Sequence, residues 1–348
     1  MKHAASFFLV LLLASLACSL EFNPPPLSFT PPPGQATQPP VILVATPTFT
    51  ALPPTLPLPA PTETQLAATP TQVPALPSAT PFLPTLTLEQ LRNLSITIKG
   101  ADQIMRTISL KDGKFERGSD PADPGYIRAR LGEKIAFGDL NQDGLEDAAI
   151  TISENYGGSG VFVSLIAILN REGQPDALAS LPVDDRPIIN ELAIKDGEIF
   201  MDATIHGPAD AMCCPALPST RFYRLIENSL VLSRFSTRTP SGAERIIQID
   251  SPVNGTGISG PFVIKGSVTI SPFENNLSYA IYKPGSNDPL EKAGFVISAD
   301  GLGGPGTFEL PLDLTRYANL GAVRIEISDF SPADGSYLAS RTIFLTLK

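Results

Sequence analysis

The chain has 348 residues, a net charge of −10, 36 prolines, three cysteines, two histidines and no tryptophan. An acidic surface repels phosphate backbones, so we do not expect nucleic acid as a partner. Only His206 would remain after removal of an N-terminal signal, and one histidine cannot form a multi-histidine metal centre. No Ser-His-Asp or Cys-His motif is evident either, which argues against nucleophilic catalysis.

The first seventeen residues have the pattern of an export signal. Lys2 supplies a positive charge, and the apolar run Phe7–Ala17 is shorter than the ~20 residues of a membrane-spanning helix. The sequence Ser15-Leu16-Ala17-Cys18 resembles the lipobox of bacterial lipoproteins. This resemblance implies cleavage after residue 17, lipid attachment at Cys18 and anchoring at the outer face of the cell membrane. The alternative is plain secretion, because Ser15-Leu16-Ala17 also fits an ordinary signal-peptidase site.

Residues 18–86 are expected to form a lipid-anchored linker rich in proline and threonine. Nineteen of the 36 prolines lie between Pro24 and Pro84, and no Lys or Arg occurs between His3 and Arg92. Proline lacks a backbone N–H, and too little apolar surface is available to offset the entropy of ordering the segment. We therefore expect a disordered stalk with a reach of at most about 190 Å, at about 3.1 Å per residue.

Residues 87–236 are expected to form a β-rich domain with a little helix. Thr87 and Gln90 have capping-box spacing and predict a short helix at Leu88–Asn93. Asp112-Gly113 and Asp196-Gly197 lie between apolar stretches and predict β-hairpins. The apolar run 161–169 predicts a central strand. Ser, Thr, Pro and Gly then cluster at residues 235–244 and indicate a break before the second domain.

Residues 246–348 are expected to form a β-sandwich. Seven short apolar segments separated by turns predict its strands: Ile246–Ile249, Phe262–Ile270, Leu277–Tyr282, Gly294–Ser298, Thr307–Leu314, Val323–Ser328 and Thr342–Leu347. In the sixth segment, Val323, Ile325 and Ile327 alternate with two charged residues. Arg324 and Glu326 should therefore fall on the opposite face of the strand.

Several short motifs in this region resemble a known family. They are Ile249-Asp250-Ser251-Pro252, Val263-Ile264-Lys265-Gly266, Gly306-Thr307-Phe308 and Asp334-Gly335-Ser336. They are similar to the immunoglobulin-like domain of bacterial spore germination proteins, the GerM-associated family, over about residues 246–348. The resemblance implies an immunoglobulin-like sandwich at the outer face of a membrane. The whole chain is thus predicted to be mainly β, with an N-terminal β-rich (α+β) domain followed by this sandwich.

The stretch from Asp139 to Asp147 fits the pattern D-x-[DN]-x-[DN]-G-x-x-D and is a candidate calcium loop. Its oxygen ligands would come from Asp139, Asn141, Asp143, the Leu145 carbonyl and Asp147, because Ca²⁺ prefers hard oxygen donors. The loop resembles the calcium loop of integrin-type FG-GAP repeats, of which the chain has one copy. The alternative is a turn without an ion, since Asp, Asn and Gly are ordinary turn residues.

The segment from His206 to Pro215 contains the adjacent pair Cys213 and Cys214. Neighbouring Cα atoms are about 3.8 Å apart, closer than in ordinary disulfides, so this pair can form only a vicinal one. A soft-metal site or a redox pair is the alternative to a structural loop. Together with the calcium loop and Gly157-Gly158-Ser159-Gly160, this segment resembles an uncharacterised domain of exported bacterial proteins, over about residues 88–234.

These patterns favour a non-catalytic binding or structural lipoprotein of the cell envelope. Its partners would be the membrane, through the lipid anchor, and an envelope protein or polysaccharide. The alternative function is an extracytoplasmic hydrolase that uses a pair of carboxylates in the middle domain, since Asp and Glu are plentiful there.

Overall fold

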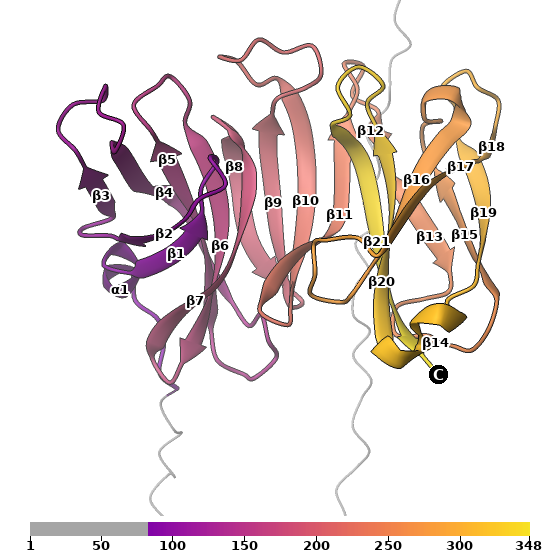
Figure 1. Ribbon diagram of the computed structural model, residues 1–348, viewed down its shortest axis with the longest axis horizontal. Coiled ribbons are helices and arrows are strands. Elements are labelled where there is room, and N and C mark those ends of the chain that lie inside the picture. The colour runs from indigo at the N-terminus through magenta and orange to yellow at the C-terminus, as the bar shows by residue number, and fades with distance from the viewer. Residues whose placement is uncertain (1–82) are drawn as a thin grey trace, which may run out of the picture. The chain divides into compact units, whose positions relative to one another are not determined.

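The computed structural model describes residues 83–348, which lie within one compact unit and are mainly β (Figure 1). The predicted signal, Cys18 and most of the predicted stalk lie outside the described residues. No helix between Leu83 and Lys348 has the length and apolarity needed to cross a bilayer.

The described chain begins with a short segment that is fixed to the middle domain. Helix α1 (Leu88–Arg92) has the predicted capping box, in which Gln90 N donates to Thr87 Oγ1 and Thr87 N donates to Gln90 Oε1. Leu86 and Leu91 are buried in the core. Asn170 Nδ2 donates to Pro84 O at 2.8 Å, and Gln90 Nε2 donates to Gly173 O at 2.7 Å. The chain is therefore held in place from Pro84 onward.

One half of the middle domain consists of two antiparallel sheets. β1 (Ser95–Lys99) pairs with β2 (Met105–Ser109). A five-stranded sheet has the order β3-β4-β5-β6-β7. Its strands are β3 (Lys114–Arg117), β4 (Ile127–Gly138), β5 (Asp147–Asn155), β6 (Phe162–Arg171) and β7 (Gln174–Asp185). The predicted central strand is confirmed, because β6 lies between β5 and β7 and most of its residues are buried.

The two Asp-Gly turns have different outcomes. Asp196-Gly197 connects β8 (Ile188–Lys195) to β9 (Glu198–Ile205), which pair with each other, so this hairpin is confirmed. The hairpin predicted at Asp112-Gly113 is wrong. Both residues have positive φ, but beyond an isolated bridge the flanking strands separate into different sheets. β2 pairs with β1 and β3 with β4, so tertiary pairing overrides the local turn signal.

A second, larger sheet has the order β17-β16-β20-β21-β11-β10-β9-β8. Its further strands are β10 (Leu217–Ile226), β11 (Ser229–Arg238), β16 (Asn276–Tyr282), β17 (Glu291–Val296), β20 (Ala322–Phe330) and β21 (Tyr337–Leu347). Outside this order, β12 (Glu244–Arg245) pairs with β11, and β14 (Gly257–Ile258) pairs with β21.

Strands β11 and β21 join the middle domain to the C-terminal domain. Their antiparallel register pairs Arg234 with Arg341, Phe235 with Ser340 and Ser236 with Ala339. β11 continues to Arg238, so the Ser-Thr-Pro-Gly cluster that indicated a break begins inside a strand. The middle domain and the C-terminal domain therefore share one hydrogen-bonded sheet.

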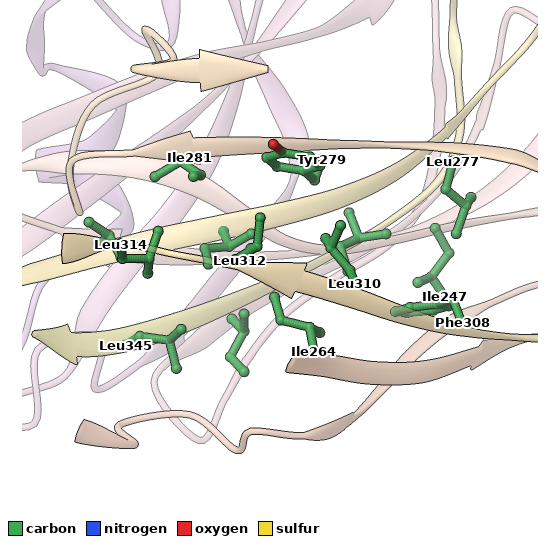
Figure 2. Packing of buried hydrophobic residues seen from close by; sticks show 14 of the residues in the cluster. Ile247, Ile264, Leu277, Tyr279, Ile281, Phe308, Leu310, Leu312, Leu314 and Leu345 are labelled. Atoms are coloured by element: carbon green, nitrogen blue, oxygen red, sulfur yellow. The ribbon is translucent and has the colours of Figure 1, made fainter. Parts of the chain in front are cut away.

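The C-terminal domain is a two-sheet sandwich. A four-stranded sheet has the order β13-β15-β19-β18, formed by β13 (Ile247–Ser251), β15 (Phe262–Val268), β19 (Gly306–Leu312) and β18 (Ser298–Ala299). Its apolar side chains form one core with those of β16, β20 and β21, and Figure 2 shows Ile264, Leu310 and Leu345 within this core. All seven predicted segments form strands, although their ends shift by a few residues.

Both faces of β20 are buried. Val323, Ile325 and Ile327 belong to the core of the C-terminal domain. On the opposite face, Arg324 is 2% exposed and Glu326 is 5% exposed. The alternation read from the sequence is confirmed, but it does not reveal that the charged face is also covered.

We expect Asp329 to make stability depend on pH. This β20 residue is 4% exposed. Its burial raises its pKa to about 6, although the positive charge of Arg245 acts in the opposite direction. Between about pH 4 and 6 the folded state therefore binds more protons than the unfolded state, and the free energy of unfolding falls as pH rises. Asp329→Asn should remove this fall and stabilise the protein by up to about 3 kcal/mol at pH 7.

Urea unfolding between pH 4 and 7 tests this expectation. The control is Asp313→Asn, because Asp313 is exposed and its pKa is lowered by hydrogen bonds from Thr315. In Asp313→Asn, the free energy of unfolding should therefore still fall as pH rises from about 4 to 6, because Asp329 is unchanged. An unchanged pH slope in Asp329→Asn would contradict the assignment.

Candidate functional site

The predicted calcium loop connects β4 to β5 and is organised by hydrogen bonds to its own backbone. Asp139 accepts from Gln142 N at 2.6 Å and from Gly144 N at 2.9 Å. Asp143 accepts from Leu145 N at 2.8 Å and from Asn141 Nδ2 at 2.7 Å. Gly144 has φ of +84°, as expected for the sharp bend.

Asp147 has a structural role in this loop. It is fully buried, and it accepts hydrogen bonds from Leu140 N and Asn170 N, each at 2.8 Å. These contacts connect the loop to β6. Burial raises the pKa of Asp147, whereas the two backbone donors lower it.

The loop contains the oxygen donors that calcium prefers, and two of its side chains, Asn141 and Asp143, are hydrogen-bonded to each other. Within residues 83–348, no three His, Cys, Asp or Glu side chains converge closely enough to hold a metal ion. A calcium ion with six to eight oxygen ligands would require Asn141 and Asp143 to turn away from each other and towards the ion. Calcium binding at Asp139, Asn141, Asp143, Leu145 and Asp147 therefore stays a prediction.

The segment with the cysteine pair is held by polar contacts. Asp184 Oδ2 accepts from His206 N at 2.6 Å and lies 3.3 Å from His206 Nδ1. His206 Nε2 lies 3.2 Å from Met212 O, and the structure joins Cys213 and Cys214 in a vicinal disulfide. These contacts favour the structural-loop interpretation of the segment.

A buried acid in the middle domain bears on the hydrolase alternative. Glu154 is 1% exposed, its pKa is raised by burial, and its Oε1 accepts from Tyr156 OH at 2.7 Å. Arg106 Nη1 donates to the same hydroxyl at 2.9 Å, and Arg106 Nη2 pairs with Asp102 at 2.5 Å. An arginine and a tyrosine thus link the two carboxylates, and this network resembles a structural ion cluster more than an acid–base pair.

The candidate site with the most distinctive chemistry is a cavity of about 450 Å³ where the two halves of the large sheet meet. We call it the junction pocket. Its walls come from the end of β7, from β9, β10 and β11, and from β16, β20 and β21 with the loops beside them. Its principal side chains are Arg221, Tyr223, Tyr282, Arg324, Glu326 and Tyr337. The volume lies within the range of small-molecule sites, about 300–1,000 Å³.

Arg324 lies in the junction pocket with only part of its hydrogen-bonding capacity used. Nη2 donates to Ser286 O at 2.6 Å and to Asn287 Oδ1 at 3.0 Å. The guanidinium carbon lies 3.7 Å from the centre of the Tyr282 ring. Nε and Nη1 are buried without a hydrogen-bond partner. Burial lowers the pKa of Arg324, opposed by the charge of Glu326.

Glu326 and Arg221 complete the charged groups of the pocket interior. Glu326 Oε1 accepts from Tyr337 OH at 2.8 Å and from Ser328 Oγ at 2.9 Å. Its Oε2 lies 3.7 Å from Arg324 Nη1, which is beyond hydrogen-bond distance. Arg221 is 9% exposed and donates from Nη1 to Val183 O at 3.1 Å, while its Nε is buried without a partner.

Comparison with known proteins identifies the C-terminal domain. Residues 246–336 match the model of a family described as the immunoglobulin-like domain of bacterial spore germination. The match agrees with the two-sheet sandwich and confirms the resemblance inferred from the sequence for this region. No curated protein matches the chain.

The sequence did not single out the residues of the junction pocket. In the sequence, Arg324 and Glu326 indicate only one face of a strand, and Arg221 shows no pattern of a site. The available signal was weak: two opposite charges two residues apart within an apolar strand. Such a pattern is usual on an exposed strand face, so it does not by itself indicate a site.

We expect Ca²⁺ to stabilise the protein if the Asp139–Asp147 loop binds it. Adding Ca²⁺ at tenfold above its Kd should raise the melting temperature by about 3 °C, and a chelator should reverse the rise. Asp143→Asn should weaken the response, because it removes one ligand charge. Measurements with Mg²⁺ at matched ionic strength provide the control. A melting temperature that responds to neither Ca²⁺ nor chelator would remove the hypothesis.

Proposed function

We propose that this protein is a non-catalytic lipoprotein of the bacterial cell envelope that presents a two-domain binding module outside the membrane. The observation that carries the proposal is the match of residues 246–336 to an immunoglobulin-like domain of bacterial spore germination, a domain type that suggests a non-catalytic module. The resemblance of Ser15-Leu16-Ala17-Cys18 to a lipobox supports the membrane location. The Pro/Thr-rich segment that follows supports display at a distance from the lipid.

The described structure supports a binding or structural role in two ways. The middle domain and the immunoglobulin-like domain share a sheet through β11 and β21, so the module can act as a single surface. The junction pocket lies beside this connection and contains buried donors without partners. The hydrolase alternative has less support, because Glu154 and Asp102 are linked through Tyr156 and Arg106.

Lipid attachment at Cys18 is tested by metabolic labelling with palmitate in a bacterial host. We expect the wild-type protein to be labelled and to sediment with membranes. Cys18→Ser should lose both properties, because two or more acyl chains are needed for stable anchoring. The control is the double variant Cys213→Ser/Cys214→Ser, which keeps Cys18 and should behave as wild type. Label that persists in Cys18→Ser would exclude the anchor.

The binding role is tested separately with the mature chain carrying Cys18→Ser, purified without lipid. We expect it to sediment with isolated envelope polysaccharide or with envelope membranes of the producing bacterium, in the presence or absence of Ca²⁺. Sedimentation with neither fraction would contradict a binding role in the envelope.

A further inference from the structure

We propose that the junction pocket binds a neutral sugar unit, with Arg221, Arg324 and Glu326 as hydrogen-bonding partners and the neighbouring tyrosine rings as its apolar wall. This inference deepens the proposed function and rests on it, because it names the class of envelope ligand that the module would recognise.

Unused hydrogen-bonding capacity in the pocket points to a ligand. Arg324 Nε and Nη1 and Arg221 Nε are buried donors without acceptors, on side chains that are 2% and 9% exposed. Leaving buried donors unpaired costs free energy, and charged donors cost more than neutral ones. A ligand that brings acceptor oxygens to these guanidinium groups, with a small shift of the two side chains to admit it, would recover part of that cost.

Glu326 makes a purely anionic ligand unfavourable. Its Oε1 already accepts two hydrogen bonds, whereas Oε2 forms an ion pair with Arg324 Nη1 at 3.7 Å and accepts no hydrogen bond. A ligand carboxylate or phosphate would place a second negative charge beside Glu326. The ligand must accept from the guanidinium groups and donate to a carboxylate, and a hydroxyl group can do both.

The charge balance of the pocket also favours a neutral ligand. Two positive side chains, Arg221 and Arg324, face two negative ones, Glu326 and Asp184. Asp184 is already occupied by His206 at the edge of the pocket. A ligand without net charge would leave this balance unchanged and would avoid burying an unpaired charge.

Aromatic rings provide the remaining surface that a sugar requires. Tyr223 and Tyr282 are buried in the wall, and Tyr337, which is 37% exposed, stands where the pocket meets solvent. The carbon-bound hydrogens of a pyranose ring can pack against the exposed part of Tyr337 while its hydroxyls reach the polar groups. Asn287, an exposed residue that already contacts Arg324, supplies an additional amide at the same side.

The test uses saturation-transfer NMR and titration calorimetry with the mature chain carrying Cys18→Ser. The probes are the methyl pyranosides of glucose, galactose, mannose and N-acetylglucosamine. Methyl glucuronide serves as the acidic probe and alanine as the zwitterionic one. We expect at least one neutral pyranoside to bind saturably with a Kd of about 1 mM, as befits a ligand of its size.

Variants locate the binding. Arg221→Met should raise the Kd by about tenfold, because it removes a charged donor. Asn287→Ala should also raise the Kd, because it removes the amide beside Arg324. The matched control is Arg234→Met. Like Arg221, Arg234 is stacked on an aromatic ring, with its guanidinium carbon 3.6 Å from the centre of the Phe222 ring, but it is only half-buried and lines a different cavity.

Three results would overturn the proposal: no binding of any neutral pyranoside, binding of only the glucuronide or alanine, or equal affinity in wild type and in both pocket variants. If the Cys18→Ser chain with an unaltered pocket still sediments with envelope material, such a result removes the sugar site and leaves the proposed function standing. If sedimentation is also absent, the proposed function fails as well.

Discussion

The pairing of β11 with β21 is the interaction on which the rest of the structure depends. Only three residue pairs define its register, yet they connect two domains that are separate in the sequence. Two side-chain hydrogen bonds reinforce it, from Thr237 Oγ1 to Leu338 O at 2.6 Å and from Thr342 Oγ1 to Leu232 O at 2.8 Å. Without this pairing each half would expose a strand edge, which is a hazard for aggregation.

The shared sheet also explains why charged residues are buried where the domains meet. The core of the immunoglobulin-like domain packs on one side of β20, so Arg324 and Glu326 must lie on the other side. That side adjoins Arg221 and Tyr223, which belong to the middle domain. The polar pocket with aromatic walls therefore lies between the hydrophobic core of the middle domain and that of the immunoglobulin-like domain. Neither domain alone contains all of its groups.

Local patterns in the sequence were sufficient to predict much of the fold. The capping box at Thr87, the hairpin at Asp196-Gly197 and the alternation in β20 each depend on neighbouring residues, and all three predictions are confirmed. The Asp112-Gly113 hairpin failed because long-range partners took both flanking strands. The junction pocket was missed for a similar reason, since Leu232 and Thr342 meet across more than a hundred residues and no local pattern encodes that contact. The calcium loop could be predicted only in part. Its turn geometry follows from its Asp, Asn and Gly residues, but the positions of its oxygen ligands relative to an ion do not follow from them.

The attachment of the N-terminal segment has a mechanical consequence. The described chain enters the fold at Pro84 and Gln90, which are held by Asn170 and by the backbone of Gly173 at the turn between β6 and β7. Tension on the preceding chain would load these two hydrogen bonds and the burial of Leu86 and Leu91 first. The short β11–β21 ladder lies far along the sequence from that point. Pulling on the chain that precedes Pro84 would therefore peel the helix before it separated the two domains.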